Sequence, residues 1–141
     1  MTDISIADFA ALVREGLPWI AQLDIAIERL ERGTARVRLK FQEGINRPGG
    51  TISGPAMMAL ADVTMYALVL SHDRTLKMAV TTSLNINFLR KPGPADLIAD
   101  GRVLKLGRRL AVLEVAIFSD GEAEPVAHVT GTYALPSGDR T

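Results

Sequence analysis

Cysteine is absent from this 141-residue chain, and histidine and tryptophan are scarce. Without cysteine there can be no disulfide, no thiolate nucleophile and no cysteine metal ligand. His72 and His128 are the only imidazoles, so we expect no metal site. Sixteen basic and sixteen acidic residues give no net charge. The charge balance therefore offers no reason to expect a nucleic acid as partner.

The first nine residues, MTDISIADF, are acidic and lack the apolar core of a secretory signal. We therefore predict a cytoplasmic location and no membrane partner. A chain of this length is most simply one domain over residues 1–141, and it is long enough to bury a sizeable core. No repeat, low-complexity segment or linker divides it.

Residues 46–70 are the most informative stretch, because a glycine-rich loop there leads into a long apolar run. Pro55 suits the first turn of a helix, and Ser53 or Gly54 can serve as its N-cap. Asp62 is the only acidic residue in the run. A helix that is apolar on nearly every side must be buried on nearly every side, so we expect a sheet to wrap it. The run looks too short and too interrupted by polar residues to span a membrane.

Shorter patterns flank this helix. Residues 5–16 carry apolar side chains on one face and predict a short helix, followed by a linker at Pro18 and Trp19. Apolar and polar residues alternate over 35–41 and 78–89, which predicts two strands. The other strands are expected at 25–30, 97–106, 110–119 and 126–135, with a disordered tail from Pro136.

The strand at 78–89 has two distinct faces. Unbroken alternation places one set of mainly apolar side chains on one face: Val80, Thr82, Leu84, Ile86 and Phe88. It places an uncharged polar set on the other: Thr81, Ser83, Asn85 and Asn87. Short turns join the later strands, which makes them antiparallel. The predicted fold class is α+β, with one antiparallel sheet curled around one apolar helix.

Several of these motifs occur together in an order that resembles the hotdog-fold acyl-CoA thioesterases of the PaaI-like type, in the 4-hydroxybenzoyl-CoA thioesterase superfamily. The matching features are Asn46 in the loop, the turn at residues 50–54, the helical sequence ALAD at 59–62, and the strand at 80–90 followed by Pro92. The resemblance covers most of the chain, from about the first strand to the last.

The resemblance implies roles for individual residues. Asp62 would be the catalytic base or nucleophile, and the backbone N–H of Gly54 would polarise the thioester carbonyl. Asn46 would help to hold water or the carbonyl, and the hydroxyl of Thr81 would assist from the partner subunit. Coenzyme A phosphates would be held by basic residues near strand ends, with no other cofactor: Arg90, Lys91, Arg108 and Arg109.

The chain departs from the family pattern at the helix start. Ser53-Gly54-Pro55 stands where the family usually has His-Gly-Gly, and the loop after Asn46 is one residue longer. Ser53 is a candidate site residue at the position of that histidine. Its simpler role is that of an N-cap, because no histidine or lysine neighbours it in sequence.

The chemistry can also be argued from the residues themselves. Thioester hydrolysis needs a group that activates water or attacks directly, and donors for the developing oxyanion. A helix N-terminus supplies backbone N–H groups, and we expect the carboxylate of Asp62 to be poorly solvated two turns further on. The structural alternative is that Asp62 only bonds backbone groups or a nearby hydroxyl such as that of Thr64.

Three functions are compatible with these features. The first is hydrolysis of an acyl-CoA thioester, and the second is a non-catalytic hotdog module that binds acyl-CoA or a related ligand. The third, a hotdog dehydratase or hydratase, is the weakest, because those enzymes generally use a histidine that the active-site stretch lacks.

Helix geometry predicts the assembly. Gly54 and Asp62 are eight residues apart, which is roughly 12 Å along one helix axis. Donor and base must both lie within roughly 3 Å of the reacting atoms or a bridging water. One chain's pair therefore cannot easily serve one carbonyl. We predict an obligate homodimer in which Gly54 of one chain faces Asp62 of the other, with a dimer of dimers as a further option. The polar face of the strand at 78–89 would lie near that interface.

Overall fold

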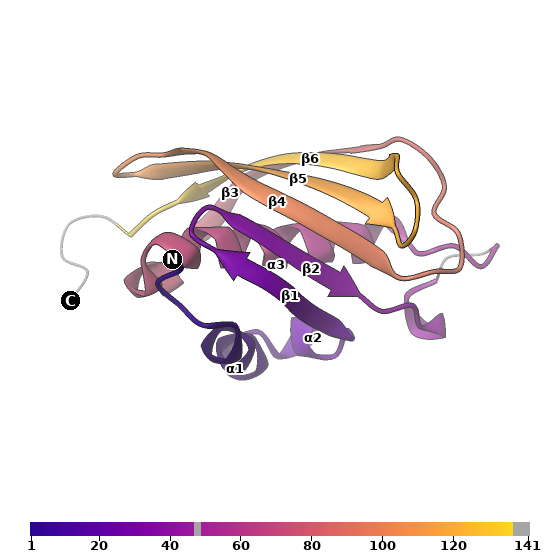
Figure 1. Ribbon diagram of the computed structural model, residues 1–141, viewed down its shortest axis with the longest axis horizontal. Helices are drawn as coiled ribbons and strands as arrows, with labels where there is room; N and C mark the ends of the chain where they lie inside the picture. Colours follow the sequence, from indigo (N-terminus) through magenta and orange to yellow (C-terminus); the bar gives the residue numbers. More distant parts are fainter. Residues whose placement is uncertain (47–48, 137–141) are drawn as a thin grey trace.

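The computed structural model describes residues 1–46 and 49–136, which form six antiparallel strands and a long helix behind them (Figure 1). The elements in chain order are α1 (Ile6–Gly16), α2 (Pro18–Ala21), β1 (Ile25–Glu31), β2 (Thr34–Leu39), η1 (Glu43–Ile45), α3 (Gly54–His72), η2 (Arg74–Met78), β3 (Val80–Phe88), β4 (Leu97–Leu106), β5 (Leu110–Ser119) and β6 (Pro125–Ala134). The predicted α+β class is confirmed.

The strand order in the sheet is β1-β2-β4-β5-β6-β3, and every neighbouring pair is antiparallel. β3 is therefore an edge strand, although it is the first strand after α3 in the sequence. α3 packs across one face of the sheet and contacts strands from both edges. The core lies between them, because the side chains that alternate inward from each strand meet a helix that is apolar almost all round.

α3 begins as the sequence predicts. Ser53 is the N-cap, and its side chain accepts a hydrogen bond from the backbone N–H of Ala56. Pro55 occupies the first turn, where no intrahelical N–H donor is needed. By length and composition alone the helix could cross a membrane, so the expectation that it is too short was wrong. In the most apolar 18-residue stretch of α3, 72% is buried inside the molecule, which identifies α3 as a core helix.

The flanking elements differ from the predictions in detail. Pro18–Ala21, expected as a linker, forms the short helix α2, with proline preorganising its first turn. Arg74–Met78 forms the 3₁₀ helix η2, so Met78, expected to begin a strand, ends a helix instead. The tail predicted from Pro136 lies outside the described residues from position 137 onward.

β3 contains a bulge that changes which side chains face α3. Thr81 pairs with Tyr133 and Ser83 with Thr132, so Thr82 is an extra residue on β3. The expected alternation was therefore wrong at this point, because it assumed an unbroken register. Thr81, rather than Thr82, lies on the side of the sheet that faces α3, together with Leu84 and Ile86.

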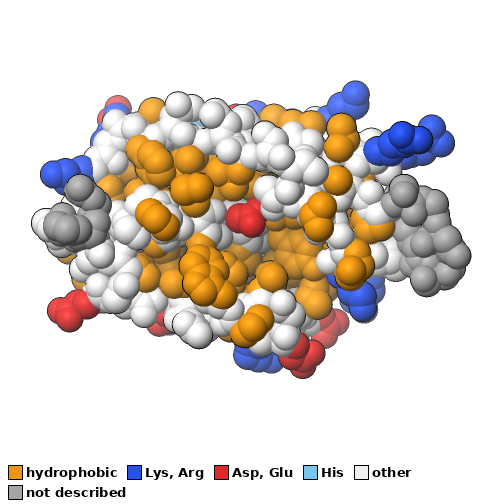
Figure 2. Space-filling view, turned by 180° about the vertical axis from the view of Figure 1, so that it is seen from behind, with side chains coloured by type: hydrophobic (Ala, Val, Ile, Leu, Met, Phe, Trp, Pro, Cys, Tyr) orange, Lys and Arg blue, Asp and Glu red, His pale blue; other side chains and the backbone are white. Residues whose placement is uncertain are grey.

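One stripe of α3 remains uncovered by the sheet. Its residues are Pro55, Met58, Asp62 and Tyr66, which helical periodicity places on one face, and we refer to them as the open stripe. Met58 is 42% exposed, and at the neighbouring edge strand Phe88 is 50% exposed. Figure 2 shows the helix side of the molecule, where hydrophobic side chains cover much of the surface and acidic atoms lie near the middle. This surface is unusually apolar for one that faces water.

Candidate functional site

Asp62 accepts two hydrogen bonds on the same carboxylate oxygen. The hydroxyl of Thr81 donates to Oδ1 at 2.8 Å, and the hydroxyl of Tyr133 lies 2.7 Å from the same atom. Over residues 1–46 and 49–136 we find no hydrogen bond to Oδ2. Thr64, the alternative partner considered from the sequence, donates instead to the backbone oxygen of Leu60 at 2.7 Å.

A cavity of about 380 Å³ opens beside this carboxylate. Leu17 and Ile20, from the α1–α2 segment, form part of its wall, and Asp62 lies half-buried at its surface. The other lining residues come from α3, the segment after it, and the two paired strands: Val63, Tyr66, Lys77, Ala79, Val80, Thr81 and Tyr133. The arrangement places one carboxylate oxygen against protein hydroxyls in a largely apolar hollow.

The aromatic side chains near Asp62 form a stack. Tyr66 lies between Phe9 and Tyr133, with ring centroids 5.8 and 6.4 Å away, respectively. Burial raises the pKa of the Tyr133 hydroxyl, and the negative charge of Asp62 raises it further. Tyr133 is therefore protonated at neutral pH and can donate. Burial also raises the pKa of Tyr66, whose hydroxyl donates to the backbone oxygen of Lys77 at 2.6 Å.

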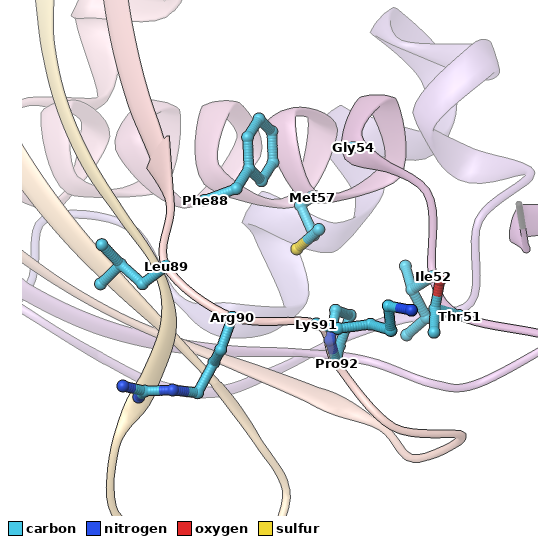
Figure 3. A pocket seen from close by; sticks show the side chains of 9 residues that line it. All are labelled: Thr51, Ile52, Gly54, Met57, Phe88, Leu89, Arg90, Lys91 and Pro92. Carbon is cyan, nitrogen blue, oxygen red and sulfur yellow. The ribbon is translucent and has the colours of Figure 1, made fainter.

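Gly54 lines a different cavity, of about 420 Å³, at the start of α3 (Figure 3). A side chain on Gly54 would meet the ring of Phe88, because an added Cβ would lie 3.3 Å from Cζ. In Figure 3 the amine of Lys91 extends toward Thr51, whereas Arg90 points away. The Thr51 hydroxyl is buried and has no hydrogen-bond partner among the residues described.

The loop residues predicted from the sequence gather at this helix start. Asn46 forms an isolated bridge with Ile52, and the backbone N–H of Ser53 donates to Ile45 at 2.9 Å. Oδ1 of Asn46 is buried without a partner in the described part of the chain. The Ser53 hydroxyl caps the helix, which is its simpler predicted role. The structure thus brings Asn46, Ser53 and Gly54 together, and separately brings Asp62 and Thr81 together.

The four basic residues predicted to contact coenzyme A lie in two places. Arg90 and Lys91 follow β3 and line the Gly54 cavity, and Arg90 also contacts Glu124 at 3.2 Å. Arg108 and Arg109 lie in the β4–β5 hairpin. Cross-strand pairing places that hairpin near the other end of β3, where Leu110 pairs with Ala134 and Ala134 with Val80. One chain therefore does not bring all four together.

Tyr133 is the site residue that the sequence analysis missed. It lies 71 positions from Asp62 and follows no local motif. The sequence pattern that could have indicated Tyr133 is the alternation of β6, which places Tyr133 on the same sheet face as Val129 and Gly131. The bulge in β3, which pairs Thr81 with Tyr133, has no comparable sequence signal.

Comparison with solved structures identifies this arrangement as the hotdog fold. A crystal structure of an inferred thioesterase from Silicibacter sp. TM1040 is 43% identical, covers 97% of this chain and 95% of its own, and gives a TM-score of 0.86. A mutant of the phenylacetic acid degradation protein PaaI from Thermus thermophilus is 27% identical, with a TM-score of 0.74 over 83% of this chain and 97% of its own.

Sequence comparison agrees with the structural one. An inferred esterase from Saccharolobus solfataricus is 30% identical over 113 residues, which are 80% of this chain and 74% of that protein. The model of the thioesterase superfamily matches residues 49–126, a range that includes Gly54, Asp62 and Thr81. The chain belongs to the thioesterase superfamily. Membership and these relatives support thioester hydrolysis in general.

Proposed function

We propose that this protein hydrolyses acyl-CoA thioesters at a site built from two copies of the chain. The observation that carries the proposal is the carboxylate of Asp62. It is held at Oδ1 by two hydroxyls, has Oδ2 unbonded within the described residues, and borders a cavity on an open helix face. A carboxylate in this setting can take a proton from water or attack a carbonyl.

Two reaction sequences use this oxygen. As a general base, Oδ2 accepts a proton from water while the water oxygen bonds to the thioester carbon. The C–S bond then breaks, and the coenzyme A thiolate receives the proton. As a nucleophile, Oδ2 bonds to the carbonyl carbon and displaces the thiolate, and water hydrolyses the resulting anhydride. Single turnover in ¹⁸O-labelled water separates them, because only the nucleophilic route can place the label in Asp62.

The oxyanion of either route needs a donor, for which we propose the backbone N–H of Gly54. This group is in the first turn of α3, where N–H groups have no intrahelical acceptor and the helix dipole favours negative charge. Asn46 lies nearby, and its buried side-chain oxygen has no hydrogen-bond partner among the described residues, so its amide group can orient the carbonyl or the water. Ser53 positions the turn through its cap and has no further role in the proposal.

The second copy follows from the separation of these groups. If two α3 helices pack antiparallel about a twofold axis with Gly54 facing the partner's Asp62, the residue midway between them faces its own copy. That residue is Met58, an apolar side chain that is 42% exposed on the open stripe. β3, beside the stripe, is an edge strand whose Val80 is 58% exposed. A dimer of this kind would cover both Met58 and the edge strand β3. Two such dimers could pair into a tetramer.

The same twofold symmetry would bring the two pairs of predicted coenzyme A-binding residues close together. Arg90 and Lys91 lie beside Gly54, whereas Arg108 and Arg109 lie near the end of β3 that carries Thr81. An antiparallel pair brings the first two of one chain close to the last two of its partner. We propose that they hold the phosphates of coenzyme A, which is part of the substrate and the only cofactor-like group required. A cytoplasmic location, without nucleic acid or membrane as partner, stays a prediction from the sequence.

Thiol release from a panel of acyl-CoA substrates, followed with a thiol-reactive dye, tests the proposal. We expect the wild type to release coenzyme A, and Asp62→Asn to fold normally but lose about 10²- to 10⁴-fold in kcat. A folded Asp62→Asn protein with the wild-type rate would make Asp62 structural. Acyl-CoA binding without thiol release would instead establish the non-catalytic binding module, which the replacement of His-Gly-Gly by Ser53-Gly54-Pro55 keeps in consideration.

A further inference from the structure

We infer that Tyr133 is a positioning residue that, together with Thr81, fixes the orientation of the Asp62 carboxylate and leaves Oδ2 as its reactive oxygen. The inference rests on the proposed function and deepens it, because it distinguishes the two oxygens of one carboxylate.

The two donors form one cross-strand unit. Thr81 on β3 and Tyr133 on β6 are directly paired in the sheet, and both hydroxyls lie within 2.8 Å of Oδ1. Thr81 can take part only because the bulge at Thr82 turns it toward α3. Two hydrogen bonds to one oxygen restrict rotation of the carboxylate about its Cβ–Cγ bond. Oδ1 is thereby occupied, and Oδ2 accepts no hydrogen bond from the described residues.

The Tyr133 hydroxyl has one proton and two neighbouring acceptors. The Asp62 backbone oxygen lies 3.0 Å from it, and the carboxylate Oδ1 lies 2.7 Å from it. The carboxylate is both nearer and charged, so it is the stronger acceptor. The position of the Tyr133 ring is fixed by packing, because the residue is only 3% exposed and its ring stacks on that of Tyr66.

The remaining titratable and charged groups of this cavity are few in the described chain. Tyr66 of α3 donates to a backbone oxygen, and Lys77 of η2 lines the cavity with an exposed side chain. Neither makes a hydrogen bond to the Asp62 carboxylate. The two hydroxyls on Oδ1 are therefore the side-chain donors that orient this carboxylate within the described residues. Removing one should lower kcat by loosening that orientation, with little effect on KM.

Tyr133→Phe tests this directly, since it removes the hydroxyl and keeps the stacked ring. We expect kcat to fall about 10- to 100-fold, which corresponds to loss of a hydrogen bond to a charged group. KM should change little, so the loss should appear in kcat. Tyr66→Phe is the matched control, because it removes a hydroxyl of the same kind from the neighbouring ring. Its kcat should fall less than that of Tyr133→Phe, since the Tyr66 hydroxyl donates to the backbone oxygen of Lys77 and not to Asp62.

A double-mutant cycle separates positioning from packing. If Tyr133 acts through Asp62, Tyr133→Phe should cause no further loss in the Asp62→Asn background. An equal loss in both backgrounds would overturn the inference and assign Tyr133 a separate role. Wild-type kcat in folded Tyr133→Phe would overturn it as well, while a normal Asp62→Asn defect would leave the proposed function standing. A wild type that releases no thiol would refute both.

A second measurement applies if Tyr133→Phe does not fold. The chain contains two tyrosines, so Tyr66→Phe leaves Tyr133 as the only site for incorporated 3-fluorotyrosine. Fluorination makes the phenol a stronger donor without removing the ring. The ¹⁹F resonance of this residue should shift on Asp62→Asn, because the hydroxyl then meets a neutral amide in place of a carboxylate. A resonance that does not shift would overturn the inference.

Discussion

Substitutions at Gly54 can separate the backbone donor from the space around it. Gly54→Ala keeps the N–H and adds a Cβ, whereas Gly54→Pro adds a comparable Cβ and removes the N–H. Both variants place a Cβ before Pro55, which disfavours the helical backbone at the preceding residue, so they share this cost. Ser53 already has the extended backbone that a following proline requires, with φ −71° and ψ 153°. Its cap on Ala56 does not involve Gly54.

The expected magnitudes follow from the surroundings of Gly54. The new Cβ would lie 3.3 Å from Cζ and 3.6 Å from Cε1 of Phe88, whose half-exposed ring can move by the few tenths of an ångström required. Replacing glycine by alanine in a helix stabilises by up to about 1 kcal/mol, which offsets this crowding. Gly54→Ala should therefore keep a near-normal kcat, with a Tm lowered only by the restriction that Pro55 places on a residue with a side chain. Gly54→Pro should lose about 10²- to 10³-fold in kcat, the usual effect of deleting one oxyanion donor.

The assay is steady-state thiol release for both variants, with thermal unfolding to establish that each is folded. The ratio of the two kcat values isolates the N–H, because both variants carry the same crowding against Phe88. A ratio near one would refute the reasoning, since the N–H of Gly54 would then contribute nothing that the transition state uses. Equal and severe losses in both folded variants would identify the space beside Phe88 as the essential feature instead.

Two further predictions concern the assembly and coenzyme A. Chains with Asp62→Ala and chains with Gly54→Pro should each be nearly inactive alone, but an equal mixture that exchanges subunits should recover about one quarter of wild-type activity, because half of its dimers carry one intact site of two. A mixed dimer that demonstrably forms yet stays inactive, or a fully active monomer, would exclude the shared site. Arg90→Ala and Arg108→Ala should raise KM for acyl-CoA more than they lower kcat, whereas Arg102→Ala, which removes a pair with Glu114 at 2.7 Å, should leave KM unchanged. An unchanged KM for acyl-CoA, beside a clear effect on an acyl-carrier-protein substrate, would refute the coenzyme A assignment.

Local sequence patterns were sufficient to predict the fold, the start of α3 and Asp62, but not the two hydroxyls that bond to Asp62. The start of α3 could be predicted because Ser53 and Pro55 have strong positional preferences, and Asp62 stands out as a charge within an apolar helix. Strand boundaries followed from alternation, which depends only on neighbouring residues. The face of Thr81 could not be predicted, because a bulge is set by the pairing of β3 with β6 rather than by β3 itself. Tyr133 was missed for the same reason, since its role depends on a contact across 71 residues.

The place of β3 in the sheet has a consequence for when the Asp62 site can form during folding. β3 follows α3 and η2 in the chain, yet its partner in the sheet is β6, which comes after β4 and β5. The two hydroxyls that meet Oδ1 come from this pair of strands. Contacts between segments so distant in sequence are the slow ones to form. We therefore expect a partly folded chain that has α3 but not the β3–β6 pairing to contain the carboxylate without its oriented oxygen.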